Sequence, residues 1–426
     1  MEKCLKERVL DTWKDTLDNP EGGSPLVGNK RYVIAQILEN SRRELGSAAS
    51  VNMLMETAPT NNINNSGSGS IGTWDPILMA LNRRAMPNIM AYDICGVSVM
   101  TGPTGLVFAL KSAYSTMGGT EALFNEPNTA FSGAASPAHA GSDPFGTYTT
   151  GGGMTTAAAE ALGDGSTSFA EMAFRIDKIT VEAKSRALKA EYTIELAQDL
   201  QAIHGISAES ELANILASEL IAEINRQNVR NLYYIAKPGA QLNTATAGTF
   251  DLDVDSNGRW SVERFKGLMF QIERDANTIA KETRRGRGNI LVCSSDAASA
   301  LVMAGVLDYA PAMSSNLTVD DTGNTFVGVL NGRFKVYVDP YFLSSGTDEL
   351  VMVGYKGSNP MDAGYFYCPY VPLQMLKAVG QDSFQPKVAF KTRYGIVENA
   401  FYAQTNGALT AVSNPYYRKI KVTNIM

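Results

Sequence analysis

The chain has 426 residues, of which 44% are apolar and 19% are charged, and its net charge is −6. This length suffices for two or three domains with a sizeable core. The acidic balance excludes a broad nucleic-acid-binding face, which needs clustered Lys and Arg. The four cysteines (Cys4, Cys95, Cys293 and Cys368) form no CxxC pair, which excludes a zinc framework and predicts reduced, buried thiols.

No run of 18 apolar residues occurs, so we expect no membrane span. The N-terminus is charged and amphipathic and lacks the apolar core of a secretion signal. The four reduced thiols fit a cytosolic site of synthesis.

The first 56 residues carry 17 charges, against 10 in residues 57–170. Apolar residues at helical spacing predict two helices here, one before and one after a Pro/Gly-rich break at residues 19–28. The stripes are Leu5, Val9, Trp13 and Leu17, and then Val33, Ile34, Ile37, Leu38 and Leu45. Two interpretations stay open: a partner-binding or bundle-forming segment, or solvated surface helices.

Two later segments lack the pattern of packed structure. Residues 57–75 are polar and Gly/Ser-rich, which predicts a flexible arm. Residues 102–170 are rich in Gly, Ala, Ser and Thr and almost uncharged. So long a stretch without periodicity is uncommon in a compact domain, and it predicts an extended loop ordered by something outside the subunit.

From Ala173 the pattern becomes regular. Apolar residues alternate over 174–183, and the pattern resumes over 188–192, which predicts one long strand, either regular or bulged. Ser207 is then expected to cap a helix running to about Tyr234, with Glu209 and Glu211 in its first turn. Its apolar positions are Leu212, Ile215, Leu216, Leu220, Ile224 and Leu232.

Residues 260–375 predict a compact α/β unit. It contains a helix ending at Arg284-Arg285-Gly286, a buried strand at 290–292, a helix near Asp296 and strands near 350–353 and 365–367. Asn331-Gly332 between apolar runs predicts a hairpin. The first helix has Phe265, Leu268, Met269, Ile272 and Ile279 on its apolar face. Residues from Phe384 onward are expected to return as strand to the preceding domain.

The candidate chemistry is sparse. The two histidines, His139 and His204, lie apart and outside any HExxH motif, so we predict no catalytic and no metal site. His204 is best explained as a helix-end residue. Gly102-Pro103-Thr104-Gly105 lacks the GK[ST] of a phosphate loop, and Gly286 is explained by helix termination. No cofactor is expected, and the chain is predicted not to be an enzyme.

One basic cluster, Arg284, Arg285 and Arg287, has two interpretations. It is either a solvated helix end or a contact to carboxylates of a neighbouring subunit.

Seven segments, in order along nearly the whole chain, carry a resemblance to a known family. They are RRAMPN with AYDICGV (83–97), GPTGLVFALK (102–111), MAFRIDKITVEAKSRALKAEYTIELAQDLQAIHG (172–205), ELANILASELIAEINR (211–226), RGRGN (285–289), VGYKGSNPMDAG (353–364) and FQPKVAFKTRYGI (384–396). These segments resemble the major capsid proteins of T-even-type (T4-like) contractile-tailed bacteriophages.

The resemblance implies an α+β, HK97-like capsid fold divided into six parts. These are a cleaved propeptide (1–56), an N-arm (57–101), an extended loop with a reduced insertion (102–172), a peripheral domain with a long spine helix (173–259), an axial domain (260–375) and a C-terminal return to the peripheral domain (376–426). The low charge and high Gly, Ala and Thr content of residues 131–169 lead us to expect only a loop where family members can carry a folded insertion.

The resemblance also implies a function. Copies of the chain are expected to form hexameric capsomers of an icosahedral or prolate head, a virion component that encloses phage DNA without sequence-specific binding. Expected partners are scaffold protein, a prohead protease, a vertex protein and decoration proteins. The family's protease prefers (Ile/Leu)-x-Glu, which places the cleavage at Leu54-Met55-Glu56, before Thr57.

Two other interpretations are weighed against this one. A pentamer-forming vertex paralogue shares the family, but the matching segments favour the hexamer-forming protein. An α/β enzyme with the Gly-rich loop as its lid would need catalytic groups beneath that lid, and the sequence offers none.

Overall fold

The computed structural model combines helices and strands, which confirms the predicted α+β class. It describes residues 2–18, 26, 28–51, 89–134, 136–141, 143, 145–163, 168–205, 207–256, 258, 260–305, 307–309, 325–342, 348–380, 384–399 and 409–425. The chain forms two compact units. Unit 1 comprises Met1–Leu106 and Thr180–Met426, and unit 2 comprises Val107–Ile179.

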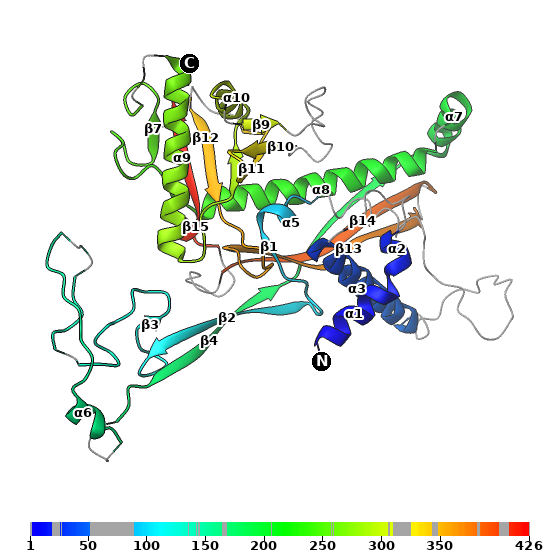
Figure 1. Cartoon of the computed structure of the whole chain (residues 1–426). Helices are drawn as coiled ribbons and strands as arrows, with labels where there is room; N and C mark the ends of the chain where they lie inside the picture. The colour runs from blue at the N-terminus through cyan, green and yellow to red at the C-terminus, as the bar shows by residue number, and fades with distance from the viewer. Residues whose placement is uncertain are drawn as a thin grey trace. The chain divides into compact units, whose positions relative to one another are not determined.

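Unit 1 contains an eight-stranded sheet, beside which helices α9 (Ser261–Thr283) and α10 (Ser295–Met303) lie (Figure 1). Its strand order is β6-β15-β12-β8-β11-β10-β9, and β7 pairs with β15. The central strand β8 (Ile290–Cys293) is buried throughout, as predicted from its apolar run, and pairs with β12 (Glu349–Gly354). The other strands are β6 (Ala236–Pro238), β7 (Thr249–Asp251), β9 (Leu307–Tyr309), β10 (Thr325–Leu330), β11 (Phe334–Val338) and β15 (Asn414–Thr423).

Two helices pack beside this sheet. Helix α9 (Ser261–Thr283) contacts β15 and β12, and α10 (Ser295–Met303) contacts α9 and β12. The five apolar residues predicted for the face of α9 are all buried, which confirms the helical pattern.

The end of α9 corrects one prediction. Arg284 adopts the left-handed conformation (φ 54°) and its N–H donates to Ala280 O, so the helix ends before Gly286 is reached. Gly286 is required for a different reason. A Cβ at this position would lie 2.5 Å from Cε2 of Tyr355, so only glycine lets the backbone pass the tyrosine ring.

The Asn331-Gly332 hairpin is confirmed. Leu330 of β10 pairs with Phe334 of β11, and the turn between them has positive φ at Asn331 (54°) and Gly332 (67°). Asparagine and glycine tolerate this backbone better than other residues, which is why the pair predicted the turn.

A second, four-stranded sheet has the order β1-β13-β14-β5. It contains β1 (Gly96–Val97), β13 (Tyr365–Val379), β14 (Pro386–Glu398) and β5 (Lys184–Glu191). β14 pairs with β13 and β5, whereas β15 belongs to the eight-stranded sheet. The C-terminal strands therefore divide between the two sheets.

The single strand predicted over 174–192 is wrong in one respect. The structure divides it at Ala183 into β4 (Met172–Glu182) and β5, which join different sheets. Alternation continues on both sides of the break, so the sequence pattern did not reveal it.

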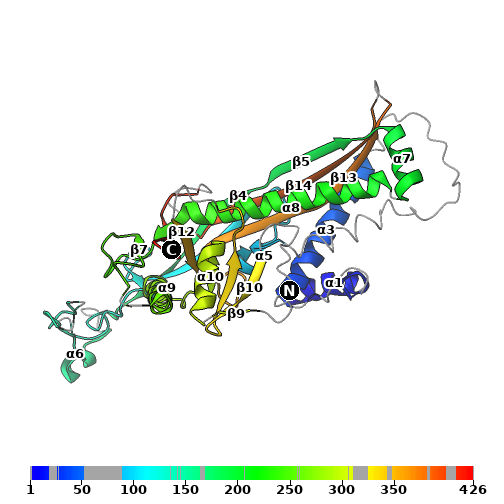
Figure 2. The same ribbon diagram turned by 90° about the horizontal axis from the view of Figure 1, so that it is seen from above.

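The predicted long helix is α8 (Ala208–Ile235), which runs along β14 and β5 (Figure 2). Leu216, Leu220, Ile224 and Leu232 are buried, but Ile215 is 54% exposed because it lies on the side away from the core. Ser207 occupies the N-cap position without a capping side-chain bond.

The preceding helix α7 (Ile194–His204) ends at Gly205 (φ 67°). This confirms His204 as a helix-end residue.

The predicted N-terminal helices pack on each other. They are α1 (Glu2–Thr12), α2 (Lys14–Asp18) and α3 (Asn29–Val51). Trp13 and Leu17 are buried in one cluster with Ile34, Ala35 and Leu38, and α3 also contacts β13. The helices are therefore packed against the body of unit 1 and are not simply solvated.

A buried charge joins α8 to the eight-stranded sheet. Asp339, directly after β11, is 2% exposed and accepts two bonds from Nη1 of Arg226, at 2.8 and 2.7 Å. The hydroxyl of Tyr233 donates to the same carboxylate at 2.9 Å. Burial, and then the Asp339 carboxylate, raise the pKa of Tyr233 well above its usual range, so the phenol stays neutral and donates.

We expect Arg226→Met to lower the free energy of unfolding by about 3 kcal/mol, because Asp339 would remain buried without its cation. Urea unfolding of the purified chain measures the loss. The matched control is Arg264→Met, which removes an exposed ion pair with Asp253 and should cost under about 1 kcal/mol. Equal losses in the two variants would contradict this role of Arg226.

Candidate assembly surfaces

Unit 2 is built on a ribbon of three strands. β2 (Thr104–Tyr114) lies between β3 (Glu121–Ala122) and β4 (Met172–Glu182), as Figure 1 shows. The prediction of a loop without regular structure from residue 102 is therefore wrong at β2. Residues 106–110 (LVFAL) are apolar on both faces of the strand, which hid the two-residue alternation.

One face of this ribbon is apolar and exposed. The N–H of Ser115 donates to Glu171 O, and the N–H of Ala183 donates to Pro103 O at the other end of the ribbon. The two strands therefore run antiparallel, with even-numbered residues of both on one face. That face carries Phe108, Leu110, Met172, Phe174 and Ile176, each more than half exposed. A contiguous group of large apolar side chains in water is typical of a surface that another chain covers.

The opposite face is different in kind. Val107, Ala109 and Ala113 are buried, and Lys111 pairs with Asp177 at 2.9 Å. The Lys111 ion pair holds the pKa of Asp177 below its usual value. Because this face is already packed, the exposed apolar face is the one available to a partner.

The rest of unit 2 contains little regular structure. Between Phe131 and Phe169, the described residues include one short helix, α6 (Thr156–Glu160), and an isolated bridge between Ala140 and Thr149. Phe145 is 99% exposed in this region.

The predicted arginine cluster lies in the turn after α9. Arg284, Arg285 and Arg287 are all exposed, which leaves the cluster accessible. Arg287 pairs within the chain, at 3.0 Å from Glu273, and Glu273 also holds Arg333 at 2.5 Å. Arg287 and Arg333 therefore share Glu273, which braces α9 against the β10–β11 hairpin.

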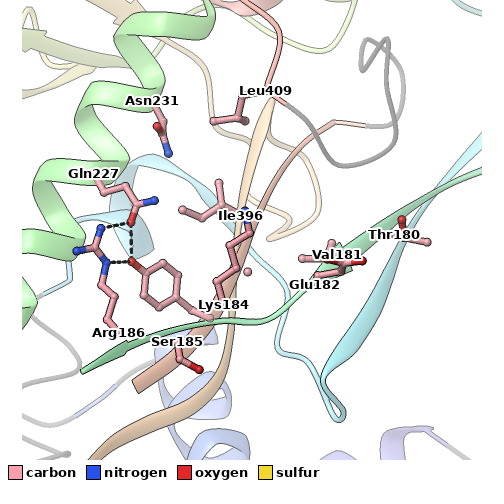
Figure 3. A pocket seen from close by; sticks show the side chains of 12 residues that line it. Thr180, Val181, Glu182, Lys184, Ser185, Arg186, Gln227, Asn231, Ile396 and Leu409 are labelled. Carbon is pink, nitrogen blue, oxygen red and sulfur yellow. Dashed lines mark hydrogen bonds between the residues drawn. The ribbon is translucent and has the colours of Figure 1, made fainter. Parts of the chain in front are cut away.

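A cavity of about 630 Å³ lies between α8, β5 and β14 (Figure 3). At its wall Nε of Arg186 donates to the Tyr394 hydroxyl at 2.6 Å, and Nη2 donates to Gln227 Oε1 at 2.7 Å. The Tyr394 hydroxyl in turn donates to Gln227 Oε1 at 2.6 Å, and Glu223 accepts from Nη1 of Arg186 at 2.6 Å. These groups are bonded to one another, which suits them to joining α8 to the sheet.

The described residues contain no group of three His, Cys, Asp or Glu side chains that could hold a metal ion. His139 is hydrogen-bonded to Thr129 at 3.1 Å in unit 2. The three cysteines whose side chains are described, Cys95, Cys293 and Cys368, are free and buried, and burial raises the pKa of each to about 12. Among the described helices, none is long and apolar enough to cross a membrane.

The predicted cleavage residues, Leu54, Glu56 and Thr57, lie outside the described residues. The exposed face of the β2–β4 ribbon was the surface that sequence reasoning missed. Its one available signal was the alternation of Met172, Phe174 and Ile176 with smaller or charged residues.

Comparison with known proteins gives one consistent family. The family model of the major capsid protein Gp23 matches residues 71–422. The major capsid protein of Salmonella phage ViI is 38% identical over 384 residues, covering 83% of this chain and 85% of the relative. That of Enterobacteria phage T4 is 36% identical over 488 residues, covering 93% and 92%.

A capsid vertex protein of phage T4 is also related, at 27% identity over 245 residues and 54% of each chain. Among solved structures, the capsid of Myoviridae phage XM1 aligns with a TM-score of 0.41 and 10% identity, over 79% of this chain and 92% of that one.

We expect the double substitution Phe108→Ser and Phe174→Ser to weaken self-association at least about tenfold, because it removes apolar area from the exposed face. Sedimentation velocity measures the association, and circular dichroism checks that the fold is kept. The control pair, Leu123→Ser and Phe145→Ser, removes exposed apolar side chains elsewhere in unit 2. Unchanged association of the ribbon variant would rule out this face as an assembly surface.

Proposed function

The chain belongs to the Gp23 family of phage major capsid proteins, and from this premise we propose that its copies form hexameric capsomers, enclose the phage DNA and lose residues 1–56 on maturation. The family members are structural shell proteins, so the chain is a capsid component and not an enzyme.

The exposed apolar face of the β2–β4 ribbon supports assembly from many copies. A monomer gains nothing from holding Phe108, Phe174 and Ile176 in water, whereas a shell subunit can bury them on a neighbour. In the proposed capsomer, the ribbon lies across the adjacent subunit, and residues 260–375 meet their copies around the axis. In this proposal, the exposed cluster of Arg284, Arg285 and Arg287 contacts carboxylates of such a copy.

The charge of the chain suits a container for DNA. A net charge of −6 does not favour non-specific electrostatic binding to phosphates. We therefore expect the inner surface of the shell to enclose DNA without binding it with high affinity. The proposed location is the virion capsid, after synthesis in the host cytoplasm.

The cleavage proposal gains support from a comparison of motifs. The (Ile/Leu)-x-Glu pattern also ends at Glu7, Glu39, Glu223 and Glu398. Those four lie in α1, α3, α8 and β14, where the backbone is hydrogen-bonded in a helix or sheet and cannot enter a protease cleft in extended form. The fifth match, Leu54-Met55-Glu56, lies outside the described residues, and it is the one at which we propose cleavage.

The proposed partners follow from this role. Scaffold protein and a prohead protease act on residues 1–56 during assembly, and a vertex protein and decoration proteins complete the shell. The related vertex protein offers a second candidate, a pentamer-forming role for this chain. We favour the hexamer-forming role, because identity to major capsid proteins is higher and extends over more of the chain.

We expect the protein taken from purified particles to have the intact mass of residues 57–426. Glu56→Ala should leave the mass of the full chain and stop particles at an immature stage, since the protease loses its preferred residue. Glu7→Ala is the matched control, because it alters the same motif in α1 and should mature normally. Mature particles from the Glu56→Ala virus would disprove the site.

A further inference from the structure

Helix α3 is a core element of unit 1. Nine consecutive residues, 33–41, are buried, whereas a surface helix buries only one stripe. Val33 and Ile37 belong to the main hydrophobic core of unit 1. On the other side, Ile34 and Leu38 pack on the α1–α2 segment.

The contact to the body is also polar and specific. The side-chain amide of Asn40 donates to Met100 O at 2.8 Å and to Tyr370 O at 3.1 Å. Both acceptors are main-chain carbonyls, one just after β1 and the other in β13. Gln36 donates to the Asn40 carbonyl oxygen at 3.4 Å, which completes the bonding of the amide.

The N-terminal end of α3 is also held against the body of unit 1. Lys30 pairs at 2.7 Å with Asp93 of α5 (Ala91–Ile94). Val33 lines one small cavity together with Tyr92 and Val97, which places these apolar side chains against the helix. The groove that receives α3 thus consists of residues 92–100 and the adjoining part of β13.

We propose that this groove is a binding site for residues 29–41 as a separate amphipathic helix, so that fragment 1–56 stays bound after the chain is cut behind Glu56. This inference rests on the proposed cleavage. Peptide-bond cleavage removes none of the described side-chain contacts or hydrogen bonds of residues 29–41, because these residues lie more than ten positions before the cut. Dissociation of the fragment, and not the cut, is then the step that changes the subunit.

Dissociation has a defined consequence for the body. It leaves the carbonyls of Met100 and Tyr370 without the donor that now satisfies them, and it uncovers the apolar residues against α3. Both effects favour a rearrangement that covers the groove again. The fragment therefore acts as a non-covalent clamp on the uncut form of residues 89–100 and β13.

The test uses the full-length chain with a sequence for a site-specific protease in place of residues 53–57. After complete cutting, we expect the N-terminal fragment to co-elute with the body on size exclusion, with the helical circular dichroism unchanged. Immediate separation of the fragment from a folded body would overturn the proposal. The natural protease is not involved, so a negative result for the Glu56 site leaves this test intact.

Asn40→Asp in the same chain places a carboxylate beside two carbonyl oxygens and removes two buried hydrogen bonds. It should therefore speed release of the fragment at least about tenfold. Asn29→Asp makes the same change at the exposed start of α3 and should leave release unchanged. Equal release rates in both variants would contradict the role of Asn40. If Asn40→Asp does not fold, a labelled peptide of residues 26–44 is added to the cut wild-type chain, and its exchange into the groove is measured. The site is refuted if the fragment dissociates and the peptide does not bind in its place.

Discussion

Two adjacent residues of α8 join both sheets of unit 1. Arg226 pairs with buried Asp339 beside the eight-stranded sheet, and Gln227 accepts from Arg186 and Tyr394 of the four-stranded sheet. Successive side chains on a helix point about 100° apart, so one turn can reach two different layers. Each contact includes a charged group that is costly to leave unpaired inside a protein, which makes the position of α8 specific as well as stable. The rest of unit 1 is arranged around this helix.

Unit 1 and the β2–β4 ribbon differ in how they bury apolar side chains, and this difference suits a subunit of a shell. Unit 1 has a large buried apolar core and also exposes scattered side chains such as Phe270 and Phe384, whereas the β2–β4 ribbon gathers Phe108, Phe174 and Ile176 on one exposed face. Strong self-contained packing everywhere would leave a subunit without surfaces for its neighbours. In the proposed shell, the exposed apolar face of the ribbon contributes moderate contact energy that is repeated at every subunit.

The N-terminal helices make a second kind of contact, which is internal to the subunit. Their charged sequence is compatible with a removable segment, yet α3 is packed as deeply as the permanent elements. Under the proposed cleavage, the subunit has two states, one with the groove between residues 92–100 and β13 filled by α3 and one with it empty. Packing on α3 also stabilises the short helices α1 and α2, since isolated helices of 11 and 5 residues are marginal in water.

The sequence by itself determined the elements whose signals are local. The apolar spacing of α8 and α9, the buried strand β8 and the Asn331-Gly332 turn were all predicted, because helical period, apolar runs and turn residues depend on neighbouring positions. The family was also evident from ordered segments along the chain. Only the tertiary structure decided the division of 174–192 into β4 and β5, the Tyr355 ring as the reason for Gly286, the exposed face of the ribbon and the burial of α3. Each of these depends on which distant segment lies alongside, such as β14 beside β5 or β13 beside α3, and such pairing leaves no period in a single sequence.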